Sequence, residues 1–541
     1  MVDSSTVEID VLVFGVDALS HDILSRLPEG TAPTIESLVE DGASGPLESQ
    51  LPPWTPSAWP TIYTGVNPGK HGIYGFLRFE GYDWDVVNAT DINEYTLWEL
   101  LSQQGRSSVV VNAPVTHPPP EFDGALIPGY IAPEDPECHP EGLLDEVRDA
   151  IGEYRLYNRQ LSDGASKSER IDGYEDVVGM RGRAFRYLLE RERPDMGFIQ
   201  FQQSDTVFHE FPEDERAPAR VYEAIDSEIE STLELCDPDA VILVSDHGIG
   251  PYDGYEVRPN TLLREQGLVE TSTDSEKPAW TTISKQRLRN GGTETEPEGK
   301  STAETILSAA ANVGITSQRI GTVLERLHLD QAVLRVVPDD LVKAAGEHVD
   351  FPQSVAYMRD RIEIGIRINL EGREPEGVVS PDEYDSVRSE LIETFETLET
   401  PGGKPAFEEV LPREEVFEGP YVEDAPDVII VPNAFDQFLS ASIRDSVFGT
   451  PREPWNHKRH GIVSVSGADI EPAEFEGAHL LDIAPTVMSL LGVPPSDRMD
   501  GTVLPGFEPL EPTSYPEYTG TDAETNDADV ESRLADLGYI E

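Results

Sequence analysis

Acidic and imidazole side chains follow several apolar runs of this sequence. Asp17 ends the run VLVFGVD at 11–17, while Asp246 and His247 follow the run AVILV in the segment VSDHG. Asp205 and His209 are four residues apart in QQSDTVFHEF, so on a helical turn they face the same side. Mixed carboxylate and imidazole ligation suits Zn²⁺ or Mn²⁺, and paired ions of this kind stand ~3.5–4 Å apart in phosphoryl-transfer enzymes. These spacings favour a site for two divalent cations.

A further imidazole can come from the segment WNHKRHGIV, which holds His457 and His460 three residues apart. Each piece also has a plainer interpretation. An aspartate at a strand end is often a helix cap, which applies to Asp17, and Asp205 with His209 also fits a surface pair on a helix. The adjacent Asp246 and His247 are harder to explain by structure alone, because a strand-to-turn transition there offers two ligand types together.

A hydroxyl-rich loop is the second chemical element. The segment QLPPWTPSAWPTIYTGVNPGKHGIYGF at 50–76 combines prolines, glycines and hydroxyls and predicts a rigid loop that enters a helix at about Ser57. A hydroxyl at a helix N-terminus meets backbone N–H groups that hold an anion, and a Thr or Ser bound to a metal becomes a nucleophile near neutral pH. Ordinary capping by Thr55 or Ser57 is the structural alternative.

The sequence predicts alternating strands and helices as the secondary structure that positions these residues. Apolar runs typical of buried parallel strands lie at 11–17, 107–114, 195–201, 240–248, 425–432 and 461–467. Helical patterns lie between several of them, as at 95–105 and 219–236. Together they predict an α/β fold with a mainly parallel sheet. Such sheets bind ligands outside the carboxyl ends of their strands, where Asp17 and Asp246 are placed.

The remaining chain divides into less regular parts. A polar loop is predicted near 271–303, a helical stretch at 304–346, and an insertion with a strand and a helix at 350–424 that caps the site. The low-complexity segment 508–530 is expected to be extended or disordered, and the last eleven residues to form one short helix.

Composition narrows the class of protein. The 541 residues carry 40 Lys and Arg against 103 Asp and Glu, a net charge of −63 spread along the whole chain. Such a surface repels polyanions, which argues against nucleic-acid wrapping. It is typical of proteins that stay soluble at high salt, as in halophilic archaea, because the screening length falls to ~3 Å at 1 M. Two cysteines, no signal peptide and no transmembrane segment favour a cytoplasmic location.

The order of the motifs resembles the alkaline phosphatase superfamily. It is most similar to the type I phosphodiesterase/nucleotide pyrophosphatase branch and the related predicted phosphohydrolase/phosphomutase proteins. The resemblance rests on GVDALSHD, PPWTPSAWPTIYTGVNPGKHGIYGF, SDTVFHEF, VSDHG, NHKRHGIVSVSG and HLLDIAPTVMSLLGVP, which span about residues 9–507. It implies a three-layer core with helices on both faces of the sheet, formed by 1–250 and 425–507. It also implies an inserted cap at 251–424 and an acidic tail at 508–541.

The resemblance also implies a phosphoester hydrolase with a threonine nucleophile and two divalent ions, Zn²⁺ first and Mn²⁺ second. The substrate expected is a small-molecule, lipid or glycan phosphoester. One ion would be held by Asp17, Asp246, His247 and the nucleophile Thr55, and the other by Asp205, His209 and His457. His457 is preferred to His460 because it matches the H-x-x-x-G spacing through Gly461.

One position departs from the family pattern. Nucleotide pyrophosphatases carry an Asn three residues after the nucleophile, where this chain has Ala58, so nucleotide substrates are in doubt. Phosphate contacts are then expected from backbone N–H groups near Ser57, or from Lys70 or Arg459, among which the sequence does not choose.

Three rival functions are less favoured than hydrolysis of a phosphoester. A sulfatase would need C/S-x-P-x-R, and the nearest segment, CHPEG at 138–142, has Gly142 where Arg is required. A phosphomutase or phosphotransferase of the same superfamily would use the same chemistry, a mutase with Ser57 in place of Thr55. A non-catalytic binding protein is disfavoured because all seven expected positions hold competent residues.

Overall fold

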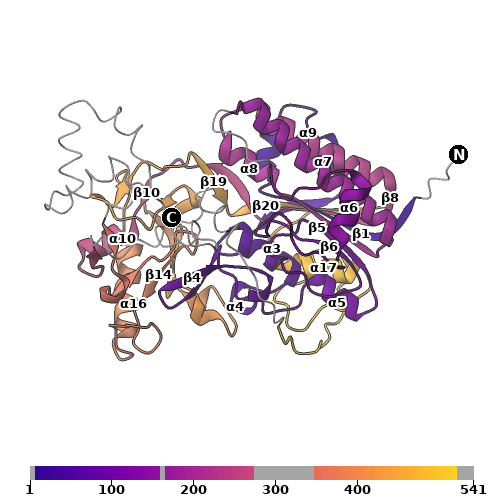
Figure 1. The fold of residues 1–541 in the computed structure, drawn as a ribbon. Helices are drawn as coiled ribbons and strands as arrows, with labels where there is room; N and C mark the ends of the chain where they lie inside the picture. The colour runs from indigo at the N-terminus through magenta and orange to yellow at the C-terminus, as the bar shows by residue number, and fades with distance from the viewer. Residues whose placement is uncertain (1–5, 159–164, 273–346, 469, 521–529, 531–541) are drawn as a thin grey trace, which may run out of the picture.

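One large sheet forms the centre of the molecule (Figure 1). The computed structural model describes residues 6–158, 165–272, 347–468, 470–520 and 530. Within them the strand order is β21-β2-β20-β8-β1-β7-β5-β6, and β22 also pairs with β2. The strands are β1 (Val7–Val16), β2 (Ala43–Glu48), β5 (Ser108–Val111), β6 (Gly124–Ile127), β7 (Met196–Phe201), β8 (Cys236–Val244), β20 (His460–Ser466), β21 (Ala473–Glu474) and β22 (Ala478–His479).

The middle of this sheet is parallel, as predicted: β8, β1, β7, β5 and β6 run the same way. The parallel pairing predicted for the strand at 461–467 is wrong, because β20 runs antiparallel to both β8 and β2. The cause is a hairpin-like pair in which β9 (Gly248–Pro251), just after β8, pairs antiparallel with β19 (Trp455–Lys458), just before β20. The chain therefore returns beside β8 in the opposite direction.

Helices cover both faces of the sheet, which confirms the predicted layered α/β core. Along β1 the side chains alternate between faces: Val11 and Val13 pack with α3, α5 and α17, whereas Leu12 and Phe14 pack with α7 and α9. Figure 1 shows these two helix groups on opposite sides of the strands. The principal helices of the core are α1 (His21–Arg26), α2 (Pro33–Glu40), α3 (Thr55–Thr64), α4 (Pro68–His71), α5 (Leu97–Gln103), α6 (Leu143–Ile151), α7 (Lys167–Glu192), α8 (Gln203–Glu210), α9 (Arg216–Leu235) and α17 (Ile483–Leu490). The helices predicted at 95–105 and 219–236 correspond to α5 and α9.

A second, antiparallel sheet lies beside the core, at the orange end of Figure 1. It has its own apolar cluster and is flanked by α10 (Pro259–Glu265) and α16 (Tyr384–Glu396). Its strands, in order, are β13 (Ala356–Tyr357), β14 (Gly365–Ile368), β16 (Val428–Pro432) and β15 (Phe407–Pro412).

The strand predicted at 425–432 exists as β16, but its assignment to the parallel sheet is wrong. β16 pairs antiparallel with β14 and β15 in the second sheet. An apolar run indicates only that a strand is buried. Here α16 and the second apolar cluster bury β16 away from the core sheet.

Several segments bear on the other predictions. Of the polar loop near 271–303 only Thr271–Ser272 is described, as β11, paired with β12 (His348–Val349). The predicted helices at 304–346 and at the last eleven residues lie outside the described residues. In the described part of the tail, 508–520, no helix or strand forms, and the division of the chain at 250/251 and 424/425 stays a prediction. Among the described helices, none is long and apolar enough to cross a membrane.

Candidate metal and phosphoryl-transfer site

Three neighbouring parallel strands deliver most of the predicted ligands to one edge of the sheet. Asp17 directly follows β1, and Asp246 with His247 follows β8. β7 leads into α8, which carries Asp205 and His209 one helical turn apart. Because β8, β1 and β7 are adjacent and parallel, their carboxyl ends meet at the same place.

The β9–β19 pair supplies the remaining imidazole. His457 lies opposite Ile249 in this ladder, two residues beyond His247. The two imidazole rings stack with centroids 3.6 Å apart and planes 20° from parallel. Gly248 permits the close return of the chain, because a Cβ there would lie 2.3 Å from the backbone oxygen of His460.

The first predicted ligand group is compact and buried. The carboxylate oxygens of Asp17 and Asp246 and the ring of His247 lie within 4.8 Å of one another. His247 Nε2 is 3.1 Å from Asp246 Oδ2 and 3.6 Å from Asp17 Oδ1. The hydroxyl of Thr55 lies 3.3 Å from the same nitrogen. All three ligand side chains have no exposed surface.

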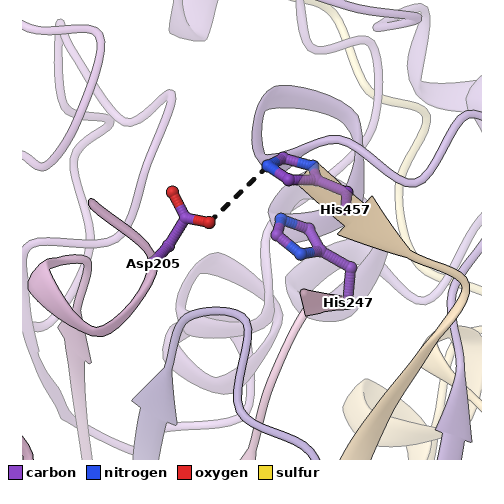
Figure 2. A group of neighbouring side chains, drawn as sticks. All are labelled: Asp205, His247 and His457. Atoms are coloured by element: carbon purple, nitrogen blue, oxygen red, sulfur yellow. Dashed lines mark ion pairs between the residues drawn. The ribbon is translucent and has the colours of Figure 1, made fainter. Parts of the chain in front are cut away.

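The second predicted group gathers around Asp205 (Figure 2). Its Oδ1 lies 3.2 Å from His209 Nε2 and 3.6 Å from His457 Nε2, and these two nitrogens are 3.3 Å apart. Figure 2 also shows His247 beside His457, and Asp205, His247 and His457 form a second set of ligand atoms within 4.8 Å. His247 therefore stands between the two groups.

Backbone carbonyls orient two of the imidazoles. Nδ1 of His247 lies 3.0 Å from the oxygen of Gly248, and Nδ1 of His457 lies 3.0 Å from the oxygen of Pro53. A carbonyl only accepts, so each Nδ1 carries the hydrogen and donates it. The Nε2 atoms keep their lone pairs and face the carboxylates, which is the usual arrangement of metal-ligating histidines.

The donor atoms fit divalent cations. Asp17 Oδ1, Asp205 Oδ1 and Asp246 Oδ2 are buried and accept no hydrogen bond within the described residues. Buried carboxylates without compensation are costly, so three such oxygens converging with imidazole nitrogens call for positive charge between them. Oxygen and nitrogen donors in this mixture suit Zn²⁺ or Mn²⁺.

Burial and the neighbouring charges also shift the pKa values of these side chains. Burial, and then the charges of Asp246 and Asp205, raise the pKa of Asp17 well above its usual value. Burial would lower the pKa of His247, but the neighbouring Asp246 carboxylate raises it. The pKa of His457 falls well below its usual value through burial and the adjacent His247 and His209, which keeps the imidazole neutral.

Thr55 is the first residue of α3, two residues earlier than the predicted helix start. The hydroxyl of Ser57, the alternative nucleophile, instead donates to the oxygen of Pro52 at 3.0 Å and accepts from Gln50 Nε2 at 2.9 Å. Ser57 therefore closes the loop before α3, whereas the Thr55 hydroxyl faces the ligand group. The backbone N–H groups of Ser57 and Ala58 donate to the oxygen of Trp54.

Three predicted alternatives are placed elsewhere. Lys70 pairs with Asp500, and Arg459 pairs with Glu48 at 2.6 Å. His460 is exposed and lies opposite Glu48 in the sheet, while His457 is buried beside Asp205. The structure thus brings together the seven predicted site residues and gives Lys70 and Arg459 acidic partners of their own.

Sequence reasoning missed the residues that hold Asp17. Its Oδ2 accepts from Gln200 Nε2 at 2.6 Å and from Trp59 Nε1 at 3.3 Å. Asn112 Nδ2 in turn donates to Gln200 Oε1 at 2.6 Å. A polar residue inside the apolar strand MGFIQF was the available signal for Gln200. Gly15 makes room for Trp59, because a Cβ there would lie 2.5 Å from the indole ring.

Comparison with known proteins assigns the chain to a family. The model of the family "Type I phosphodiesterase / nucleotide pyrophosphatase" matches residues 11–462, which include all seven predicted site residues. No curated protein matches the chain significantly. Phosphonoacetate hydrolase from Sinorhizobium meliloti 1021, in complex with phosphonoformate, is similar in structure with a TM-score of 0.53 and 16% identity, covering 90% of this chain and 95% of its own.

Two further solved structures are similar to the chain at low identity. Wild-type alkaline phosphatase PafA has a TM-score of 0.50 at 14% identity and covers 92% of this chain and 98% of its own. Human ectonucleotide pyrophosphatase/phosphodiesterase 5 has a TM-score of 0.48 at 14% identity and covers 95% and 97%. At such identities the likeness to phosphonoacetate hydrolase and to PafA shows the fold alone.

Proposed function

The chain belongs to the type I phosphodiesterase/nucleotide pyrophosphatase family, and from this we propose that it hydrolyses a phosphoester through Thr55 at a site for two divalent cations. One observation carries the proposal: three buried carboxylate oxygens without hydrogen-bond partners converge with imidazole nitrogens, and the Thr55 hydroxyl lies 3.3 Å from one of these nitrogens. A merely structural cluster would not leave these oxygens uncompensated.

We assign Asp17, Asp246, His247 and the Thr55 oxygen to one cation and Asp205, His209 and His457 to the other, with Zn²⁺ or Mn²⁺ as the ions. When bound, such ions lower the pKa of a hydroxyl nucleophile and neutralise charge on a phosphoryl group. Seven ligands from separate strands and loops converge, so the fold holds them in place before substrate arrives.

The chain's own residues supply the remaining steps. Thr55 Oγ1 attacks phosphorus, the bond to the leaving-group oxygen breaks, and a phosphothreonine forms; water then attacks phosphorus and frees Thr55. Thr55 stands at the N-terminus of α3, a ten-residue helix whose dipole favours the anionic group during both displacements. His247 and His457, each oriented by a carbonyl, keep their Nε2 atoms directed at the reaction centre.

The substrate we propose is a small-molecule, lipid or glycan phosphoester. Ala58, where nucleotide pyrophosphatases of this family carry Asn, is fully buried and has no side-chain donor for phosphate. A transfer to an acceptor other than water would use the same residues. We also propose that the protein works in the cytoplasm at high salt, because its net charge of −63 requires strong screening.

The test compares wild type, Thr55→Ala and Ser57→Ala on bis-p-nitrophenyl phosphate and p-nitrophenyl phosphate. Assays are run in molar KCl with Zn²⁺ or Mn²⁺. We expect turnover in wild type and Ser57→Ala and its loss in Thr55→Ala, and the preferred ester distinguishes a phosphodiesterase from a phosphatase. An inactive wild type that binds two ions would refute hydrolysis and favour a binding role. Loss of turnover only in Ser57→Ala would move the nucleophile to Ser57.

A further inference from the structure

The strand β19 presents its two faces to different parts of the molecule. Side chains alternate along a strand, so Trp455 and His457 lie on one face and Asn456 lies on the other. On the first face Trp455 stacks on Phe208 of α8, with ring centroids 5.6 Å apart and planes 4° from parallel. Nε2 of His457 lies 3.6 Å from Oδ1 of Asp205, on the same helix (Figure 2). This face therefore belongs to the second ligand group.

Asn456 lies on the opposite face and has no exposed surface. Its Oδ1 accepts a hydrogen bond from the backbone N–H of His457 at 2.7 Å, and its Nδ2 donates to Glu453 Oε2 at 2.6 Å. Among the described strands β19 pairs with β9 alone, and such a strand has an edge whose backbone N–H groups have no partner in a ladder. The Asn456 side chain thus satisfies a backbone donor of the residue whose ring is a predicted ligand.

Glu453 continues this series of contacts to the second sheet. Its other oxygen, Oε1, accepts a hydrogen bond from Arg361 Nη2 at 3.1 Å. Arg361 lies in the connection between β13 and β14, and its side chain is only 3% exposed. A path of three hydrogen bonds therefore runs from the β13–β14 connection through Glu453 and Asn456 to the backbone of His457.

The ring of His457 has restraints of its own. Nδ1 donates to the oxygen of Pro53 at 3.0 Å, and the ring of Trp54 lies 4.3 Å away. These contacts fix the rotation of the ring, whereas the backbone position of His457 depends on β19. Its Nε2 lies within 3.6 Å of both Asp205 Oδ1 and His209 Nε2, and binding sites hold their groups to within about 0.5 Å. A small shift of β19 would therefore open the ligand group at one corner.

We propose that Asn456 is a positioning residue for His457, and that through Glu453 and Arg361 the second sheet sets the cation affinity of the second ligand group. The inference rests on the proposed function for the assignment of one cation to this group. The supports of Asp17 described above belong to β7 and α3 of the core. The second sheet should therefore act on one cation and leave the other unaffected.

The experiment measures the affinity of the metal-free protein for Zn²⁺ by competition with a chelator, in two backgrounds. Asp17→Asn weakens the first ligand group and leaves the second as the tighter site, and Asp205→Asn does the reverse. Asn456→Leu, which removes both contacts of the amide, is introduced into each background. Asn456→Asp is the conservative variant, because it keeps an acceptor for the His457 N–H.

Each variant has a matched control. Asn260 is as buried as Asn456, accepts from the backbone N–H of Met358 at 2.8 Å and donates to the oxygen of Ala441 at 2.7 Å, so Asn260→Leu removes similar contacts away from the ligands. Arg361→Met breaks the path at its far end. Its control is Arg359→Met, because Arg359 lies in the same connection, is 6% exposed and has an ion pair of its own.

In the Asp17→Asn background we expect Asn456→Leu to lower the Zn²⁺ affinity about 10- to 100-fold, as for other partners that orient metal ligands. Arg361→Met lowers it less, because Asn456 still accepts from the His457 backbone. Asn456→Asp retains more affinity than Asn456→Leu. In the Asp205→Asn background none of these variants changes the affinity, and the two controls change neither site.

Three results would overturn the inference: an unchanged affinity in Asn456→Leu, an equal loss in both backgrounds, or an equal loss in Asn260→Leu. If Asn456→Leu does not fold, Asn456→Asp and Arg361→Met decide, and affinities equal to that of the Asp17→Asn background in both overturn the inference as well.

Binding as the measured quantity separates this inference from the reaction. A wild type that binds two cations and hydrolyses no ester refutes the proposed hydrolysis alone, and the affinities still decide the role of Asn456. Zn²⁺ binding that Asp205→Asn leaves unchanged in the otherwise unaltered chain refutes the assignment of a cation to the second group, and the inference with it.

Discussion

Replacing Gln200 with Met removes the strongest support of Asp17 while keeping the volume of the buried side chain. Asp17 Oδ2 accepts two hydrogen bonds, at 2.6 Å from Gln200 and at 3.3 Å from Trp59. The shorter one is the stronger, so the variant leaves the carboxylate with one long contact. Asp17 is fully buried, so bulk solvent does not reach it to replace the lost donor.

The expected loss is in metal affinity. Partners that orient metal ligands contribute about 10- to 100-fold to affinity, or about 1.4–2.7 kcal/mol. We place Gln200→Met in the upper half of this range, because Asn112 holds the Gln200 amide in turn and the variant removes that contact too. Only the ion assigned to Asp17, Asp246 and His247 is affected. Titration of the metal-free protein with Zn²⁺ against a competing chelator should show one weakened site and one unchanged site.

A matched control separates this effect from general destabilisation. Asn369 is an equally buried amide in the second part of the molecule, where it donates to the oxygen of Ser354 at 2.8 Å and accepts from Tyr82. Asn369→Leu lowers the free energy of unfolding without touching a ligand. The reasoning is refuted if Gln200→Met binds both ions as wild type does, or if Asn369→Leu weakens the same site equally.

Three other predictions follow from separate features. Ser57→Ala should lower the free energy of unfolding by about 1–3 kcal/mol, because Gln50 loses its buried acceptor, and should keep turnover; a loss of turnover at unchanged stability would contradict this. Burial lowers the pKa of His71 to about 3, so between about pH 6.5 and 3 the unfolded chain takes up the proton first. Stability should then fall by about 1.4 kcal/mol per pH unit as the pH drops, measured by denaturant unfolding, and His71→Gln should show a shallower slope. Raising KCl from millimolar to molar should raise Tm, because the charge of −63 is then screened; a Tm that is constant or falls would refute the high-salt proposal.

The convergence of the predicted ligand residues was predictable because local pattern and topology agree there. Asp17 and Asp246 each follow a run of β-branched and apolar residues, and parallel strands place such positions at one edge. The i, i+4 spacing of Asp205 and His209 needed only one helical turn. What joined His457 to them was the family resemblance, whose H-x-x-x-G spacing through Gly461 is matched by His457 and not by His460.

The residues around the ligands were not predictable for a physical reason. Gln200 and Asn112 meet through a contact between positions that are 88 residues apart in the chain. This contact depends on side-chain direction and on the register of pairing. A single sequence shows where a polar residue lies. It does not show the register of strand pairing, and therefore not the residue's partner.

The strand at 425–432 shows that an apolar run does not by itself assign a strand to a particular sheet. An apolar run specifies burial, and a chain with two apolar clusters has two places in which to bury it. β16 pairs in the second sheet. Its last residue, Pro432, and nearby Phe435 line a small hollow beside His457. The segment before the last core motif therefore lines a small hollow beside His457, while the strands β1, β7 and β8 lead to predicted ligands. Substitutions along 428–439 should then leave metal binding intact, since none of the seven predicted ligands lies on that segment.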